Sequence, residues 1–177
     1  MKNKAAIIFT LAFSIISIVA DVFDNNQNNQ CTTRSSCSSC IAKSACVWCV
    51  TKSKCTQNTC ENGNIIYPRH IVAIMSGEYF CPRLVEEQNL IIKSGKKEFQ
   101  IKITQIHIYM AFTSWKCKVN VNGTDIMVPA ILLGDKVHCE SVFLTNNSDE
   151  EYIPGSISLM WDHNKSLDGL QKFKISK

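Results

Sequence analysis

Eight cysteines crowd into the stretch from Cys31 to Cys81, and they constrain the fold more than any other feature of the chain. Few apolar side chains lie between them, so this stretch cannot fold around a hydrophobic core alone. A small unit of this kind is held together by disulfides or by a bound metal ion.

The cysteine spacing alone leaves both alternatives open. Cys37–Cys40 and Cys46–Cys49 are C-x-x-C pairs, the usual halves of a zinc site. A zinc ribbon leaves about 15–20 residues between two such pairs, and far fewer separate these two. The short connection could still bend back around one metal ion. A thioredoxin-like redox site would need a βαβ pattern, which does not surround these cysteines.

The N-terminus decides between them by indicating the compartment. Lys2 and Lys4 precede an apolar run from Ala5 to Ala20, which predicts a secretory signal peptide at residues 1–20. The run is shorter than the roughly 20 residues of a bilayer span, which argues against an uncleaved anchor. No later stretch resembles a span, so we expect a secreted, extracellular chain with no membrane span once processed. In an oxidising compartment, the ten cysteines predict five disulfides and no zinc.

Charge and composition exclude some partners. The chain has 19 basic and 15 acidic residues, and removal of the two signal-peptide lysines lowers its net charge from +4 to +2. This charge is too weak and too scattered to predict binding to nucleic acid or to an anionic membrane. Residues 21–30 are rich in Asn and Gln and predict a flexible leader.

Residues 31–81 form the first predicted unit. Trp48, between Cys46 and Cys49, is expected to pack over the disulfides as a miniature core, with a binding hot spot as the alternative. The apolar residues 71–75 are expected to form a short helix or strand laid over the cystine cluster.

Residues 82–177 have the pattern of short strands. Residues 98–104 alternate strictly between polar and apolar, and the phase flips at Gln105, which indicates a bulge or a new strand. Residues 115–121 alternate again, and Asn122-Gly123 predicts a two-residue hairpin. In the return strand 124–133, Pro129 favours a position at a sheet edge. Roughly seven short strands with turns between them predict an immunoglobulin-like sandwich.

Cys117 and Cys139 fall on separate predicted strands of this sandwich. A bridge between them would stabilise the fold by roughly 3 kcal/mol in the chain-entropy model.

The spacing C-x5-C-x2-C-x5-C-x2-C, with Trp48 directly before the fifth cysteine, resembles the PSI domain shared by plexins, semaphorins and integrins. Val47 departs from the Gly that is common there. Sequence arithmetic alone leaves the pairing open. The resemblance implies four pairs: Cys31–Cys46, Cys37–Cys81, Cys40–Cys55 and Cys49–Cys60.

The second half is similar to the IPT/TIG domain that follows the PSI domain in plexins. The resemblance is carried by Cys81-Pro82 at the junction, Cys117 after Trp115, Cys139, and a strand ending in Trp161-Asp162. It implies a small disulfide-rich PSI domain at 31–81, an IPT/TIG sandwich at 82–177, and a Cys117–Cys139 disulfide. Plexins also carry a propeller that makes the main ligand contact, a membrane span and a cytoplasmic region, none of which is found in this sequence. In that family the PSI and IPT domains act as stalk and spacer.

No enzyme motif is present, and His70, His107, His138 and His163 lack metal-ligand spacing to one another. We therefore predict no enzymatic activity, no cofactor and no metal. Three sequons on predicted turns predict glycosylation at Asn122, Asn146 and Asn164. Asn122 is the least favoured, because a tight Asn-Gly turn can require that side chain for itself.

The predicted function is a secreted, non-enzymatic binding or spacer module with a protein partner at the cell surface, linked by resemblance to semaphorin–plexin signalling. The alternative is a secreted ligand, decoy or host-directed factor that reuses the same scaffold. Partner contacts are expected around Trp48 or on an edge strand. The sequence makes no prediction of the oligomeric state.

Overall fold

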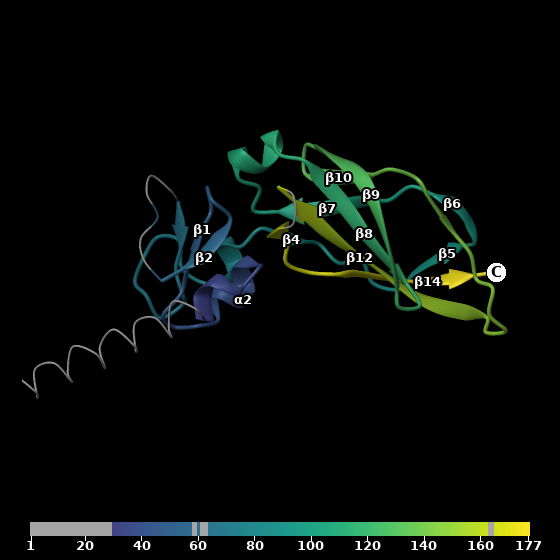
Figure 1. Cartoon of the computed structure of the whole chain (residues 1–177), viewed down its shortest axis with the longest axis horizontal. Helices are drawn as coiled ribbons and strands as arrows, with labels where there is room; N and C mark the ends of the chain where they lie inside the picture. Colours follow the sequence, from purple (N-terminus) through teal and green to yellow (C-terminus); the bar gives the residue numbers. More distant parts are fainter. Residues whose placement is uncertain (1–29, 58–59, 61–63, 163–164) are drawn as a thin grey trace, which may run out of the picture.

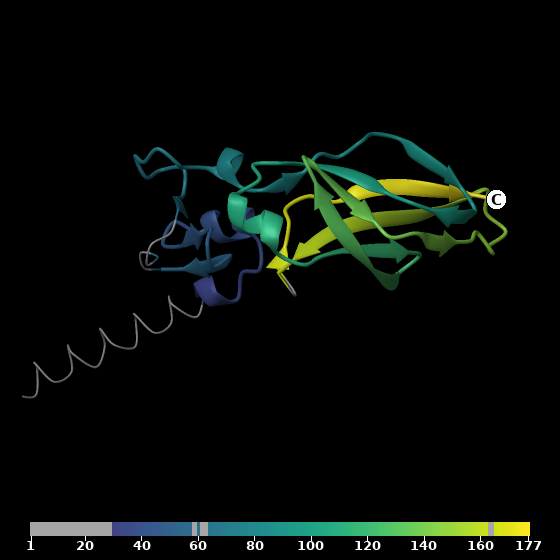
Figure 2. The same ribbon diagram turned by 90° about the horizontal axis from the view of Figure 1, so that it is seen from above.

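The computed structural model describes residues 30–57, 60, 64–162 and 165–177. The cystine-rich region and a β-sandwich lie side by side along the long axis of the molecule, in both views of Figures 1 and 2. The predicted signal peptide and residues 21–29 of the predicted leader lie outside the described residues. Within the described part of the chain, no helix is both long enough and apolar enough to cross a membrane.

The cystine-rich region contains the short helix α2 and one small sheet. Its sheet has the strand order β2-β1-β3, and all its pairs are antiparallel. The elements are α2 (Cys37–Ile41), β1 (Val47–Cys49), β2 (Lys54–Thr56), β3 (Ile65–Ile66) and the 3-10 helix η1 (Glu78–Phe80). The core consists mostly of cystine sulfur, with Ile41, Trp48, Val50 and Ile66 filling the space between the bridges. The disulfides thus replace the hydrophobic core that this stretch is too short to build.

The sandwich follows the strand order β4-β7-β10-β9-β8-β12-β14-β5, with β13 beside β12. Its elements are β4 (Arg83–Leu84), β5 (Leu90–Lys93), β6 (Gly95–Lys97), β7 (Gln100–Thr104), the 3-10 helix η2 (Ile108–Phe112), β8 (Trp115–Val121), β9 (Thr124–Leu133), β10 (Lys136–Cys139), β11 (Val142–Leu144), β12 (Tyr152–Trp161), β13 (Lys165–Ser166) and β14 (Gln171–Ser176). The long strand β9 pairs with β8 at its beginning and with β10 at its end. It therefore joins the layer that contains β4, β7 and β10 to the layer that contains β8, β12, β14 and β5. The predicted all-β sandwich is confirmed.

The chain changes its pairing partner after Lys93, between β5 and β6. β5 pairs in parallel with β14, whereas β6, only two residues further on, pairs antiparallel with β11. The side chains of the layers meet in one continuous core that includes Val119, Ile157 and Ile175, each fully buried.

The predicted hairpin at Asn122-Gly123 is confirmed. Both residues have positive φ, 47° and 84°, and Val121 pairs with Thr124 across the turn. The expectation that Pro129 marks an edge was wrong, because β9 has a neighbour on each side. The Pro129 carbonyl accepts the Glu140 N–H at 2.8 Å, so the side of Pro129 that lacks an N–H faces the end of β10. The last β10–β9 pair is Cys139 with Ala130, and the proline therefore costs no ladder hydrogen bond.

Two further expectations need correction. At Gln105 there is neither a bulge nor a new strand: β7 ends at Thr104, Gln105 has φ 58°, and the chain enters η2. Residues 71–75 form no regular element over the cystine cluster. Val72 and Ile74 are almost fully exposed, and only Met75 packs against the cluster. An apolar run of this length carries no information on which of its side chains face the core.

Candidate functional site: the domain junction and the exposed sandwich surface

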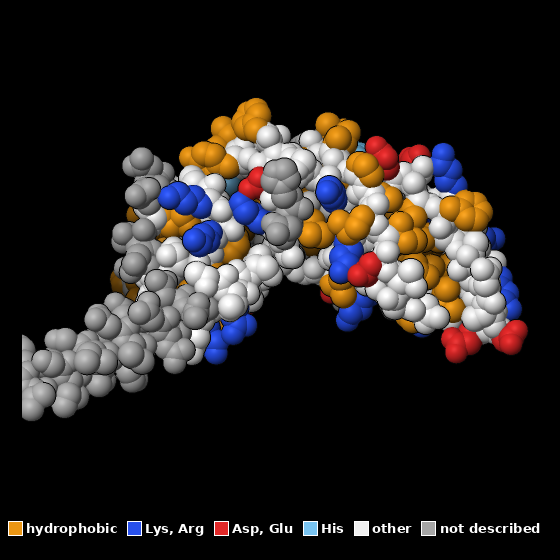
Figure 3. All heavy atoms as spheres, viewed as in Figure 1, with side chains coloured by type: hydrophobic (Ala, Val, Ile, Leu, Met, Phe, Trp, Pro, Cys, Tyr) orange, Lys and Arg blue, Asp and Glu red, His pale blue; other side chains and the backbone are white. Residues whose placement is uncertain are grey.

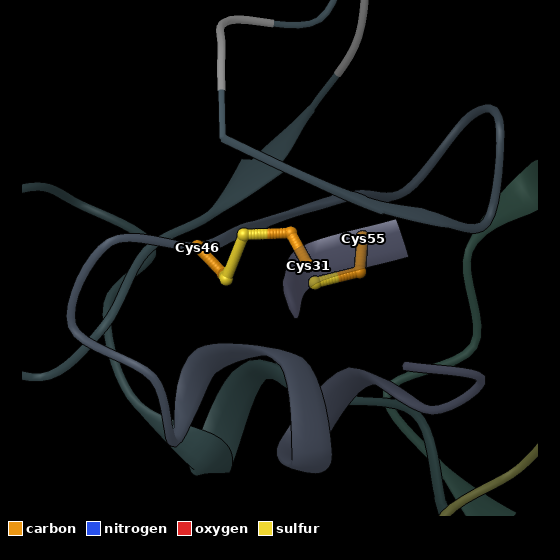
Figure 4. Close-up of side chains that lie close together, drawn as sticks. All are labelled: Cys31, Cys46 and Cys55. Carbon is orange, nitrogen blue, oxygen red and sulfur yellow. A yellow bond between two sulfur atoms is a disulfide. The ribbon is translucent and has the colours of Figure 1, made fainter. Parts of the chain in front are cut away.

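All ten cysteines are in disulfides. The five pairs are the ones that the family resemblance implies: Cys31–Cys46, Cys37–Cys81, Cys40–Cys55, Cys49–Cys60 and Cys117–Cys139. Figure 4 shows the Cys31–Cys46 bridge with the Cys55 sulfur beside it, and the three sulfurs lie within 4.8 Å of one another. This proximity results from two neighbouring bridges, because a metal binds thiolates, whereas the Cys31 and Cys46 sulfurs are bonded to each other and the Cys55 sulfur is bonded to Cys40.

Trp48 lies in the core of the cystine-rich region. It is only 2% exposed, and it pairs with Cys55 on β2 and Ile66 on β3. Of the two readings of Trp48, the structure supports the packing role. The hot-spot alternative is not compatible with this burial, because a partner could not reach the ring.

One carboxylate of the sandwich contacts the cystine-rich region at the junction. Asp168, in the loop after β13, accepts hydrogen bonds from the Ser38 backbone N at 2.9 Å and from Ser38 Oγ at 2.8 Å. The Cys37–Cys81 disulfide lies directly beside this carboxylate. The disulfide therefore ties α2 to the end of its own region, and the charge-assisted contact ties α2 to the sandwich.

The backbone of the same loop completes the junction. The Leu84 N–H donates to the Asp168 carbonyl at 2.8 Å, and the Asp168 N–H donates to the Pro82 carbonyl at 3.4 Å. The chain that leaves the cystine-rich region is thus paired with the loop that contacts α2. This role could not be predicted from the sequence, because Leu167-Asp168-Gly169 has the pattern of an ordinary turn.

His107 forms a second contact near the junction. It precedes η2 and makes a hydrogen bond with the backbone of Phe80 in η1. Its Nε2 is buried and has no hydrogen-bond partner among the described residues. Burial lowers the pKa of His107 below 6.5, and the backbone hydrogen bond opposes this shift only in part. His107 is therefore neutral in the folded protein at neutral pH.

The two described sequons have opposite environments. Asn122 is exposed at the tip of the β8–β9 hairpin. Asn146 is 8% exposed, and its Nδ2 donates to the carbonyls of Glu150, Glu151 and Ile175 at 3.0–3.3 Å. Its Oδ1 accepts from the Ser148 N–H and hydroxyl. Asn164 lies outside the described residues. The preference for Asn146 over Asn122 therefore has no support in the folded structure, and glycosylation of Asn122 remains a prediction.

Exposed apolar side chains occur on the edge strand β5, where Ile91 is 56% exposed, and also on a central strand. One set points outward from β9: Met127, Pro129, Ile131 and Leu133. Ile131 and Leu133 are 58% and 55% exposed, although β9 is a central strand. Figure 3 shows hydrophobic side chains on this part of the sandwich and over η2 near the junction. The unbroken apolar run from 126 to 133 could have predicted this exposed apolar surface, since a strand that is apolar at every residue has two apolar faces.

A groove of about 710 Å³ crosses the sandwich surface beside β5, β12 and β14. It contains Glu86, Ser156 and Lys172, but none of the described histidines lines it.

Comparison with protein families matches residues 87–176 to the TIG domain found in plexin. Among solved structures, the chain is similar to two of the plexin A4 full extracellular region, one with domains 1 to 8 and one with domains 1 to 10. The TM-scores are 0.64 and 0.63, each at 18% identity over 83% of this chain. The chain spans 16% and 13% of the length of those two chains, and the likeness at this identity concerns the fold alone. No curated protein matches the sequence.

Proposed function

The chain belongs to the family of TIG domains found in plexin, and from this we propose that it is a secreted, non-enzymatic extracellular module that binds a protein partner and holds it at a fixed spacing. The all-disulfide state of its cysteines supports an oxidising compartment. We assign residues 1–20 to a signal peptide, 31–81 to a PSI domain and 82–177 to the TIG sandwich.

The observation that carries the spacer role is the junction. The Asp168–Ser38 contact joins the second region to the first, and beside it the Cys37–Cys81 bridge ties α2 to the last residue of the first region. Inter-domain contacts are commonly mobile unless they are large or strongly tied. The connection between the two regions is therefore expected to be stiff. It is supported by a disulfide, by a carboxylate with two hydrogen bonds and by paired backbone, all at one junction.

Secretion and stiffness can be tested on the same preparation. The full chain would be expressed with its own N-terminus in a eukaryotic secretory cell, and the protein in the medium examined by intact mass and small-angle X-ray scattering. We expect cleavage near Ala20, five disulfides and a scattering curve fitted by the single elongated arrangement of Figure 1. Free thiols in an intracellular product would contradict the secreted role, and scattering that requires many domain orientations would contradict the spacer role.

The partner class that we propose is a semaphorin- or plexin-type cell-surface protein. The outward β9 residues are the first place to substitute, because an exposed central strand offers apolar contact area without a free backbone edge. Binding of the purified chain to cells that display individual semaphorin or plexin ectodomains would be compared with that of Ile131→Asp. Binding to such a protein that Ile131→Asp abolishes would support the proposal, and equal binding by both would remove the β9 face from it.

The same face supports a second candidate, a secreted ligand or decoy. A free chain with an exposed apolar face can occupy a receptor without acting as its stalk. Competition separates the two roles: a decoy inhibits binding between a semaphorin and its plexin in proportion to its concentration, whereas a spacer does not.

A further inference from the structure

The groove on the sandwich has two rows of cross-strand neighbours as its floor. One row runs from β8 across β12 to β14 and consists of Asn120, Ser156 and Lys172. The other runs from β12 across β14 to β5 and consists of Pro154, Lys174 and Ile91. All six of these residues line the groove, and so does Asn122. The Asn122 backbone N donates to the Pro154 carbonyl at 3.2 Å, which places Asn122 at one end of the second row.

The Asn122 side chain is free to carry a modification. The turn is held instead by Asn120, whose Oδ1 accepts the Gly123 N–H at 3.2 Å and whose Nδ2 donates to Asp125 at 2.6 Å. No hydrogen bond of the Asn122 side chain is found among the described residues. Asn122-Gly123-Thr124 has the acceptor pattern of an N-glycosylation site, and the turn is exposed.

We propose that Asn122 carries an N-linked glycan and that the first sugars of this glycan lie in the groove. The inference rests on the proposed secretory route, because the oligosaccharide donor is encountered there. In the covalent step, the Asn122 amide nitrogen forms a bond to the anomeric carbon of a lipid-diphosphate-linked oligosaccharide. The bond from that carbon to the diphosphate oxygen breaks, the lipid diphosphate leaves, and the amide gives up one proton.

The chemistry of the groove suits a sugar. Pro154, Ile91 and Leu170 offer exposed apolar surface for the C–H face of a pyranose ring, with Ile91 56% and Leu170 39% exposed. Asn120, Ser156 and Lys172 offer hydrogen-bond donors and acceptors for its hydroxyl groups. The volume of about 710 Å³ falls within the roughly 300–1,000 Å³ of small-molecule sites.

Because the glycan is attached at the rim of the groove, weak contacts are sufficient to keep its first sugars in the groove. A ligand tethered beside its site has an effective concentration of about millimolar or more, so contacts too weak to hold a free sugar can still hold this one. The glycan would then cover Ile91 and Leu170, two of the exposed apolar side chains of the sandwich.

The test compares the secreted, glycosylated chain with Thr124→Ala, which removes the acceptor pattern and keeps Asn122. Glycopeptide mass spectrometry reads occupancy, and methyl NMR signals of Ile91 and Leu170 read contact. We expect a glycan at Asn122 and a shift of both methyl signals relative to Thr124→Ala. The shift should survive enzymatic trimming to a single N-acetylglucosamine if the first sugar makes the contact.

A matched control moves the glycan to the other layer. Lys136→Asn with His138→Thr, in the Thr124→Ala background, creates an acceptor site on β10 and should leave both methyl signals unshifted. An exported chain with Asn122 empty, or with Asn122 occupied and both signals unshifted, would overturn this inference and leave the proposed function standing. A chain that is not exported would overturn the proposed function and this inference with it.

Discussion

Asp168 supplies the capping carboxylate for a helix in the other half of the molecule. Its two oxygens accept from Ser38, which lies 130 residues earlier in the sequence, at 2.8 and 2.9 Å. The local N-cap of α2, Ser36, makes no side-chain capping hydrogen bond of its own. A negative charge near the first turn of a helix is favourable, so the sandwich contributes to the stability of α2.

Replacing Asp168 by Ala should therefore weaken the junction. Two hydrogen bonds to a charged group are lost, and we expect the free energy of unfolding to fall by about 1.5–3 kcal/mol. Ser38→Ala keeps the backbone hydrogen bond and should cost less. Denaturant unfolding measures both, and scattering reports whether the two regions become mobile. Asp149→Ala, in an exposed loop, is the control. An Asp168→Ala protein as stable and as stiff as the control would remove this contact from the account of the junction.

Asn146 should act as a structural side chain rather than as a glycan acceptor. Asn146→Asp removes both amide donors and turns a carboxylate toward three backbone carbonyls. We expect a loss of about 2–3 kcal/mol or more in the free energy of unfolding. The neighbouring Asn147 is exposed, and Asn147→Asp is the matched control. Glycopeptide mapping of the folded protein should find Asn146 unmodified, and a glycan there would refute this assignment.

Gly155 is expected to tolerate no side chain. A Cβ at this position would meet Phe173 Cε2 at 2.2 Å, far inside van der Waals contact, and the Phe173 ring is buried beside Phe99. Gly155→Ala should cost about 1–3 kcal/mol through overpacking, measured as a lower midpoint of denaturant unfolding. Adding Phe173→Leu should recover part of the loss. Ser156→Ala, one residue along the same strand, should change stability little.

Local patterns were enough to predict the sandwich and its main hairpin. Alternation over residues 98–104 and 115–121 identified β7 and β8, because a half-buried strand must place every second side chain in the core. Asn122-Gly123 identified the turn between β8 and β9, because both positions need positive φ.

Contacts between distant residues could not be predicted in this way. Asp168 contacts Ser38 only because the fold brings the β13–β14 loop to the junction, and no local pattern carries that information. Pro129 suggested an edge, because the pattern does not show that the neighbouring strand ends beside it. Trp48 fitted both a core and a surface role, because cystine-rich regions have too few apolar residues for periodicity to decide.

The Cys117–Cys139 bridge should stabilise the sandwich independently of the other four bridges. It connects β8 to β10 across β9, the strand that joins the two layers. Replacing both cysteines by Ala should lower the free energy of unfolding by about 3 kcal/mol. A non-reduced peptide map should find the two cysteines linked to each other in the unsubstituted protein. A peptide linking either one to the cystine-rich region would contradict the pairing.

His107 should make the stability of the protein depend on pH. Its pKa is below 6.5 in the folded protein because burial disfavours the imidazolium, whereas the unfolded chain titrates near the ordinary value. The unfolded state therefore binds more protons as the pH falls below about 6.5, and the free energy of unfolding decreases until the folded pKa is passed. Above the unfolded pKa both states are neutral at this position, and the contribution is constant.

Denaturant unfolding between about pH 5 and pH 8 measures this dependence over the range in which histidine titrates. His107→Gln should flatten the profile below about pH 6.5, because a glutamine at this position takes up no proton in either state. His138→Gln, on β10 and away from Phe80, should keep the slope of the unsubstituted protein. Since the imidazole contacts η1 across the junction, protonation should also loosen the two regions, seen as a broader scattering envelope at low pH. A profile that His107→Gln leaves unchanged would show that other groups cause the acid sensitivity.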